Sequence, residues 1–285
     1  MIAIIGGLAT AGFWAVSVLV SARASRLIGA SSTVAGAMAI GLAIGLPVAL
    51  ALAPEPDFGG AAPVWMAMSG FGNVAGLLLT YAAYRIGAVG IVSTIDSTEG
   101  AVAAVISVLA GEVLVPGSGV VLAVIAVGVV LAASAGGSED GVAISRERAT
   151  RAATLAVLAA VCFALGLYGS ARAATVLPVA WAILPPRFVG VVFVAIPLLV
   201  VGRFRMTRAA LPLVAATGIV EVLGYWCFAF AARESIALAS VLSSMFAPIA
   251  AIAAYVVFRE RLSPRQIVGI ALVVCGVAAL GILQA

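Results

Sequence analysis

Apolar runs of about twenty residues recur along almost the whole chain, separated by short turns or by arginines. A helix needs ~20 apolar residues to cross the ~30 Å hydrocarbon core of a bilayer. Ten such runs lie near 3–22, 32–53, 63–84, 89–110, 117–135, 151–171, 178–201, 209–231, 236–257 and 266–283. The sequence therefore predicts an all-α integral membrane protein with ten transmembrane helices.

The composition supports lipid as the solvent around most of the chain. Of 285 residues, 65% are hydrophobic and only 9% are charged, whereas roughly a quarter of the residues in a soluble domain are charged. The 31 glycines are also typical of membrane helices, because small residues let helix backbones approach closely where no hydrophobic effect drives packing.

Several function classes lack the residues that they need. The chain has no histidine, and Cys162, Cys227 and Cys275 lie far apart inside apolar runs, so we expect no metal site, no cofactor and no disulfide framework. All fifteen basic residues are arginines scattered between apolar runs, which does not resemble a nucleic-acid-binding surface. No GxxxxGK[ST] motif for ATP is present. We predict neither catalytic residues nor an enzyme.

The arginines also predict the orientation. If the N-terminus lies outside, the outward loops hold only Arg172 and Arg233, while Arg187 lies within a span. The inward loops then hold twelve arginines, at 23, 26, 85, 146, 148, 151, 203, 205, 208, 259, 261 and 265. Cytoplasmic loops carry such an excess, so we expect both termini in the periplasm of a bacterium, with the chain in the inner membrane. The first run precedes its arginines, unlike a cleaved signal peptide.

A hydrophilic linker at 136–150 separates two units of five spans, 1–135 and 151–285. At an offset of 148 residues, Glu112-Val-Leu-Val-Pro116 aligns with Glu260-Arg-Leu-Ser-Pro264. Because five is odd, the second unit must be inverted relative to the first, and equivalent loops indeed differ in arginine content. Inverted repeats around a central cavity are the architecture of many secondary transporters.

The repeated Glu-x-Leu-x-Pro pattern resembles the EamA repeat of the drug/metabolite transporter superfamily. Residues 259–280 resemble the C-terminal end of that repeat, and Ala247-Pro248 precedes Glu260 by twelve residues. The first copy departs from the pattern, since Gly100 stands where the second copy has Pro248. The resemblance implies a basket of ten helices, with the fifth and tenth at the periphery. Members export amino acids, other metabolites or drugs, and the size is similar to that of the YddG-type amino-acid exporters.

Four charged residues fall near the middle of apolar runs: Asp96, Glu99, Arg187 and Glu221. A charge at mid-membrane costs ~2.5–3.5 kcal/mol on insertion scales and is therefore a functional candidate. Asp96 and Glu99 are three residues apart and share one helical face. They either line a water-filled path and contact substrate, or hydrogen-bond neighbouring helices. Arg187 either neutralises Glu221 or binds the carboxylate of a substrate.

The internal repeat adds two polar pairs to these candidates. Asn73 aligns with Glu221, and Asp96 aligns with Ser244, at the same offset of 148. Aromatic residues supply an apolar wall, for which helix packing or a position at the membrane interface is the alternative. The candidate cavity residues are Trp14, Asn73, Leu77, Tyr81, Asp96, Glu99, Tyr168, Arg187, Glu221, Tyr225 and Ser244.

The sequence thus favours a secondary transporter that exports amino acids or similar metabolites by alternating access. Efflux of drugs or cationic compounds is the alternative within the same class. A membrane enzyme acting on lipid-linked substrates would need a nucleophile and base that we do not find. The expected partners are a small-molecule substrate and the lipid bilayer. We expect a monomer, although glycines near 119–128 and 269–281 also fit a subunit contact.

Overall fold

A computed structural model describes residues 1–87, 89–133, 146–246, 248–249 and 264–283, and all regular structure in this part is helical. A π-helical turn, η1 (Val191–Ala195), lies between α9 and α10. The helices are α1 (Ile2–Ile28), α2 (Ala30–Leu52), α3 (Ala62–Ile86), α4 (Val89–Asp96), α5 (Glu99–Leu109), α6 (Ser118–Ala133), α7 (Arg146–Val176), α8 (Val179–Ala182), α9 (Pro185–Gly190), α10 (Ile196–Val200), α11 (Leu211–Ala232), α12 (Ile236–Ser243) and α14 (Pro264–Leu283).

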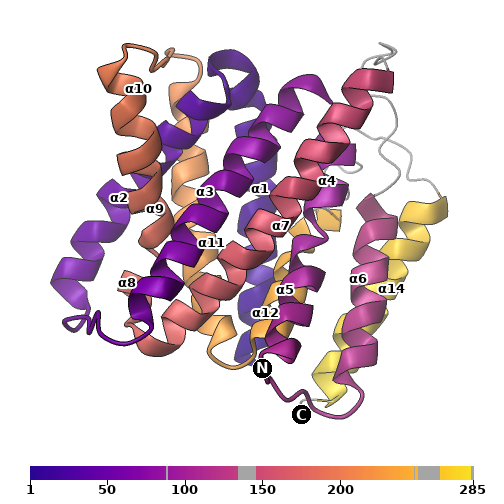
Figure 1. The fold of residues 1–285 in the computed structure, drawn as a ribbon. Helices are drawn as coiled ribbons and strands as arrows, with labels where there is room; N and C mark the ends of the chain where they lie inside the picture. Colours follow the sequence, from indigo (N-terminus) through magenta and orange to yellow (C-terminus); the bar gives the residue numbers. More distant parts are fainter. Residues whose placement is uncertain (88, 134–145, 247, 250–263, 284–285) are drawn as a thin grey trace.

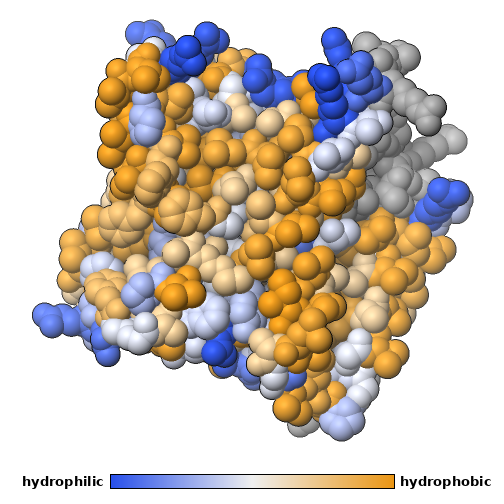
Figure 2. All heavy atoms as spheres, in the orientation of Figure 1, coloured by the Kyte–Doolittle hydropathy of each residue, from blue (hydrophilic) through white to orange (hydrophobic). Residues whose placement is uncertain are grey.

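The helices stand side by side, with the N-terminus and the end of α14 at the same end of the molecule (Figure 1). Within the described residues, six helical segments are long and apolar enough to cross a membrane, and three more apolar helices are shorter. Hydrophobic side chains form a belt around the visible face, and hydrophilic ones gather toward its two ends (Figure 2). This distribution is the one expected of helices that cross a bilayer.

Three of the ten expected spans are interrupted within the described residues. The run at 89–110 forms α4 and α5, which are separated by a turn at Ser97 and Thr98. The run at 178–201 breaks after α8 and resumes at Pro185, because proline donates no backbone hydrogen bond and favours the first helical turn. The run at 236–257 breaks at a turn formed by Ser244 and Met245, directly after α12. Residues 247 and 250–257 of this run fall outside the described residues.

The structure shortens the predicted linker, because α7 begins at Arg146 and so includes the last residues of 136–150. An ion pair of 3.0 Å joins Arg151 to Glu147, four residues earlier. Such pairs stabilise an exposed helical turn. The boundary at 151 followed the apolar pattern, which cannot detect a solvated turn.

Close backbone contacts hold α3 against α7. A Cβ atom placed on Gly72 would lie 2.7 Å from the carbonyl oxygen of Cys162, and one on Gly166 would lie 2.8 Å from the backbone nitrogen of Asn73. The hydroxyls of Ser69 and Ser170 are 2.6 Å apart in the same interface. Small residues and buried hydroxyls therefore join these two helices, as in other membrane proteins.

Helices α6 and α14 pack together and stand at one edge of the molecule (Figure 1). A Cβ on Gly128 would lie 2.9 Å from the carbonyl oxygen of Gly269, and one on Gly276 would lie 2.4 Å from a side-chain carbon of Ile125. These glycines thus serve packing within the chain.

The charged residues differ between the two ends of the molecule. Arg26 and Arg85 close α1 and α3, Arg146 opens α7, and three arginines follow α10, all at the upper end in Figure 1. The lower end has carboxylates that join distant segments. The Glu112 carboxylate accepts hydrogen bonds from the Ser235 hydroxyl (2.6 Å) and from the Ala237 N–H (3.1 Å), and so caps α12.

Candidate functional site

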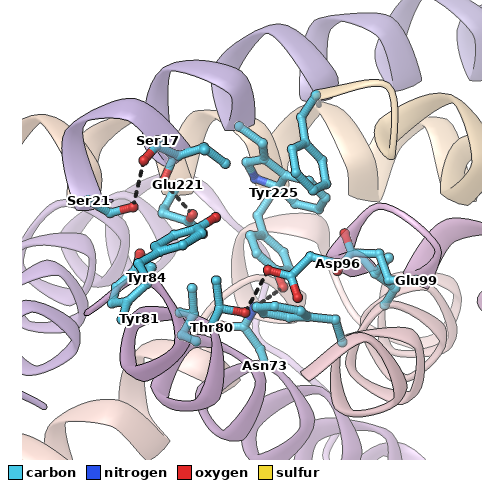
Figure 3. A pocket seen from close by; sticks show the side chains of 16 residues that line it. Ser17, Ser21, Asn73, Thr80, Tyr81, Tyr84, Asp96, Glu99, Glu221 and Tyr225 are labelled. Atoms are coloured by element: carbon cyan, nitrogen blue, oxygen red, sulfur yellow. Dashed lines mark hydrogen bonds between the residues drawn. The ribbon is translucent and has the colours of Figure 1, made fainter. Parts of the chain in front are cut away.

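A cavity lies between α1, α3, α7, α11 and the junction of α4 with α5 (Figure 3). Eight of the eleven residues predicted from sequence line it, and their role as substrate ligands stays a prediction. The full lining is Trp14, Ser17, Val18, Ser21, Asn73, Leu77, Thr80, Tyr81, Tyr84, Asp96, Glu99, Phe163, Leu167, Glu221, Tyr225 and Phe246.

The carboxyl groups enter the cavity from two sides. Glu221 belongs to α11, and its Oε1 accepts a hydrogen bond of 2.8 Å from the Ser17 hydroxyl of α1. Asp96 and Glu99 lie across from it, at the last residue of α4 and the first residue of α5. All three side chains are buried. A cavity with several buried carboxyl groups in an apolar environment favours positively charged groups.

The break between α4 and α5 places Asp96 and Glu99 side by side. Asp96 is only 2% exposed, and its Oδ2 accepts a hydrogen bond of 2.9 Å from the Thr80 hydroxyl of α3. Its Oδ1 has no hydrogen-bond partner among the described residues. The C-terminal end of α4 and the N-terminal end of α5 meet at this junction, so their partial negative and positive charges offset each other.

Aromatic side chains form the rest of the wall. The Trp14 and Tyr225 ring centroids are 5.4 Å apart, and those of Tyr81 and Tyr84 are 6.2 Å apart. The amide of Asn73 donates a hydrogen bond to the Tyr225 hydroxyl, which ties α3 to α11. Aromatic faces attract cations, so they reinforce the preference set by the carboxyl groups.

Three candidates from the sequence do not line the cavity. Tyr168 belongs to the hydrophobic core, where its ring packs edge-on against Trp65. The Ser244 hydroxyl donates to the carbonyl oxygen of Val241 in the preceding turn. The pairing of Ser244 with Asp96 at the repeat offset therefore joins a cavity residue with a residue outside the wall.

Arg187 also lies outside the wall, although it is next to it. Its guanidinium carbon is 4.5 Å from the centroid of the Tyr225 ring. It forms no ion pair within 4.0 Å among the described residues. The direct pairing with Glu221 that the sequence allowed is thus not made in this conformation.

The candidates chosen from the sequence left out several polar residues of the wall, namely Ser17, Ser21, Thr80 and Tyr84. Helical spacing offered a signal: Ser17 and Ser21 follow Trp14 at steps of three and four residues, and Thr80 follows Leu77 by three. Hydroxyls are common in membrane helices, where they usually bond to their own backbone. The sequence alone therefore does not distinguish hydroxyls that line a cavity from hydroxyls that bond to their own helix.

The cavity is not centred between the two ends. Ser21 and Tyr84 lie within two residues of Arg23 and Arg85, so the wall extends toward the arginine-rich end. Toward the other end, α5 and α12 cross closely, because a Cβ on Gly100 would lie 2.1 Å from the carbonyl oxygen of Ser240. The Glu112 cap on α12 lies beyond this crossing.

Comparisons with known proteins agree with this arrangement. Residues 150–282 match the family model described as the EamA-like transporter family, which confirms the resemblance inferred from the repeated motif. A solved crystal structure superposes with a TM-score of 0.74 at 19% sequence identity, over 99% of this chain and 96% of that chain. This likeness shows a shared fold. No curated protein matches the sequence significantly.

Proposed function

Residues 150–282 match the EamA-like transporter family, and on that premise we propose a secondary transporter that exports amino acids or similar metabolites by alternating access. The family and the apolar helices make the chain a multi-pass membrane protein that transports small molecules. What we propose beyond this is the class of substrate, the alternating-access mechanism and the orientation of the chain in the membrane.

One observation carries the proposal: three buried carboxyl groups and several aromatic rings face one cavity between the helices. An ammonium group fits this wall, because carboxylates attract it directly and aromatic faces attract it through their quadrupoles. Amino acids supply such a group together with a side chain for the apolar surface of Leu77, Phe163 and Leu167.

The asymmetry of the cavity supports alternating access. The wall reaches toward the arginine-rich end, which the charge rule for membrane proteins assigns to the cytoplasm. Toward the opposite end, α5 and α12 cross in close backbone contact at Gly100. We infer an inward-facing conformation, with the termini in the periplasm and the two five-helix units, 1–135 and 151–285, inverted relative to each other.

Efflux of cationic compounds is a second candidate, which a specific observation favours. Among the described residues, the charged side chains that line the cavity are all acidic, because Arg187 lies behind the ring of Tyr225. A wall of this kind accepts an amine without a carboxylate as readily as an amino acid.

Counterflow in liposomes tests the proposal. The purified protein is reconstituted, loaded with each unlabelled amino acid in turn, and supplied with the same labelled compound outside. We expect uptake for at least one amino acid, and loss of that uptake in Glu221→Gln. If no amino acid exchanges while a cationic dye or amine does, the second candidate replaces the first. If neither exchanges in folded protein, the transport proposal is wrong.

A further inference from the structure

Arg187 is a buried cation whose binding capacity is unused. It is 1% exposed, and neither Nη1 nor Nη2 has a hydrogen-bond partner among the described residues. A guanidinium offers five N–H donors in a planar fork that matches a carboxylate. A buried charge without a counterion is unfavourable, so this group needs an anion that the described residues do not supply.

The surrounding residues hold the Arg187 side chain in place, but they do not accept hydrogen bonds from its Nη1 and Nη2. A Cβ atom on Gly41 of α2 would lie 3.1 Å from Cγ and 3.3 Å from Nε of Arg187. The absence of a side chain at Gly41 thus leaves room for the Arg187 stem. The break before α9 fixes where the stem begins, since Arg187 is the third residue of that helix.

Glu221 is the nearest acidic candidate, and it is engaged elsewhere. It attracts Arg187 electrostatically, yet the two groups are more than 4.0 Å apart. The Ser17 hydroxyl already donates to its carboxylate. An α-amino acid carries its ammonium and carboxylate on one carbon, so it fits a gap between an acidic and a basic group that attract each other without touching.

Tyr225 separates Arg187 from the cavity. One face of its ring covers the guanidinium, while the residue itself lines the cavity. The Tyr225 hydroxyl accepts a hydrogen bond from the Asn73 amide nitrogen, and the Asn73 Oδ1 has no hydrogen-bond partner among the described residues. A rotation of the Tyr225 side chain breaks the hydrogen bond from Asn73 and opens the guanidinium to the cavity.

We propose that Arg187 binds the carboxylate of the substrate once Tyr225 turns aside, while Glu221 binds its ammonium group. This inference rests on the proposed transport function and assigns its substrate class as zwitterionic amino acids. Amines that lack a carboxylate bind only the acidic wall and leave Arg187 covered.

Matched ligands test the inference in the full-length protein. For the amino acid that gives counterflow, dissociation constants are measured for that amino acid, its methyl ester and its decarboxylated amine. Wild-type protein is expected to bind the amino acid at least 10-fold more tightly than the other two. Arg187→Gln should remove this difference by weakening only the amino acid.

Arg172→Gln is the matched control, because Arg172 also stacks on an aromatic ring, that of Trp65 at 5.2 Å, but is exposed and outside the cavity. It should leave all three affinities unchanged. If Arg187→Gln fails to fold, the ligand comparison on wild-type protein decides alone. Equal binding of amino acid and amine overturns the inference and leaves transport intact, whereas binding of none of the three overturns the transport proposal as well.

Discussion

The Ser17 hydroxyl of α1 donates a hydrogen bond of 2.8 Å to Glu221 Oε1 of α11, inside the cavity. The contact joins two residues that are 204 positions apart and lie in different halves of the chain. A serine can satisfy one lone pair of a buried carboxylate without neutralising it, so Glu221 keeps its capacity to bind a cationic group.

Glu221→Gln is therefore expected to weaken substrate binding about 10- to 100-fold, because a hydrogen bond to a charged group contributes roughly 1.5–3 kcal/mol. Glutamine has nearly the same volume and still accepts from Ser17, so the melting temperature should change little. Titration calorimetry on the substrate found by counterflow measures the effect. Glu55→Gln, in the exposed loop after α2, is the control. Equal affinity in both variants would remove Glu221 from the site.

Thr80→Val should destabilise the junction between α4 and α5. The Thr80 hydroxyl is the donor to Asp96 Oδ2, and Asp96 Oδ1 has no other partner among the described residues. Loss of the donor leaves a buried carboxyl group unsatisfied, at a cost of about 1–3 kcal/mol. Thermal unfolding in detergent should show a lower midpoint than for Thr154→Val, whose hydroxyl is exposed and bonds to its own helix. Equal midpoints would contradict the prediction.

Gly100→Ala should disrupt the crossing of α5 with α12. The added Cβ would lie 2.1 Å from the Ser240 carbonyl oxygen of α12, so the α5 and α12 backbones must separate. Overpacking of this kind costs typically 1–3 kcal/mol. We expect a lower melting temperature and loss of counterflow. Gly12→Ala in α1 is the matched control, because no atom lies within 4 Å of its added Cβ. A fully active Gly100→Ala protein would show that this crossing is not as close as described.

We expect the stability of the protein to depend on pH through Glu234, which lies beside the N-terminus. The Ala3 N–H, followed by the N-terminal ammonium group, holds the pKa of this carboxyl below its ordinary value of 4.5. A lowered folded-state pKa means that its stabilisation is fully present above pH 4.5 and is lost as the pH falls through the lowered value. Glu234→Gln should therefore lower the melting temperature at pH 7 but not near pH 2.5. A constant difference between the two proteins at both pH values would contradict this origin.

Cysteine labelling tests the orientation. Ala61 and Ala209 are exposed, in the loop before α3 and the loop before α11, at opposite ends of the molecule. Each is replaced by cysteine in a chain whose three native cysteines are serine. A membrane-impermeant thiol reagent should label Ala61→Cys in intact cells and Ala209→Cys only after permeabilisation. The reverse pattern would place the arginine-rich end outside, and labelling of both in intact cells would contradict the helix arrangement.

Much of the candidate site followed from rules that act locally along the chain. Asp96, Glu99 and Glu221 were identifiable because a charge within an apolar run is costly and is kept only where it meets a partner or a cavity. Asn73, Leu77 and Tyr81 follow one another at steps of four residues, and this helical spacing places them on one face. The break at Pro185 was identifiable too, since proline interrupts a helix whatever surrounds it.

Other features depended on contacts between distant segments. Neither the turn at Ser97 and Thr98 nor the hydrogen bond from Thr80 to Asp96 has a pattern of its own in the sequence. Tyr168 and Ser244 matched the pattern of cavity residues as well as Trp14 did, yet they lie outside the wall. Helical periodicity defines which residues share a face, but it does not define what that face contacts.

The sequence by itself determined that this chain crosses a membrane as apolar helices, that its arginines gather at one end, and that its second half carries the EamA pattern. These features depend on composition and spacing, which act through lipid and water as solvents. Only the tertiary structure decided that three carboxyl groups share one cavity while Arg187 lies behind Tyr225. Helix packing sets those distances, and it depends on which surfaces meet.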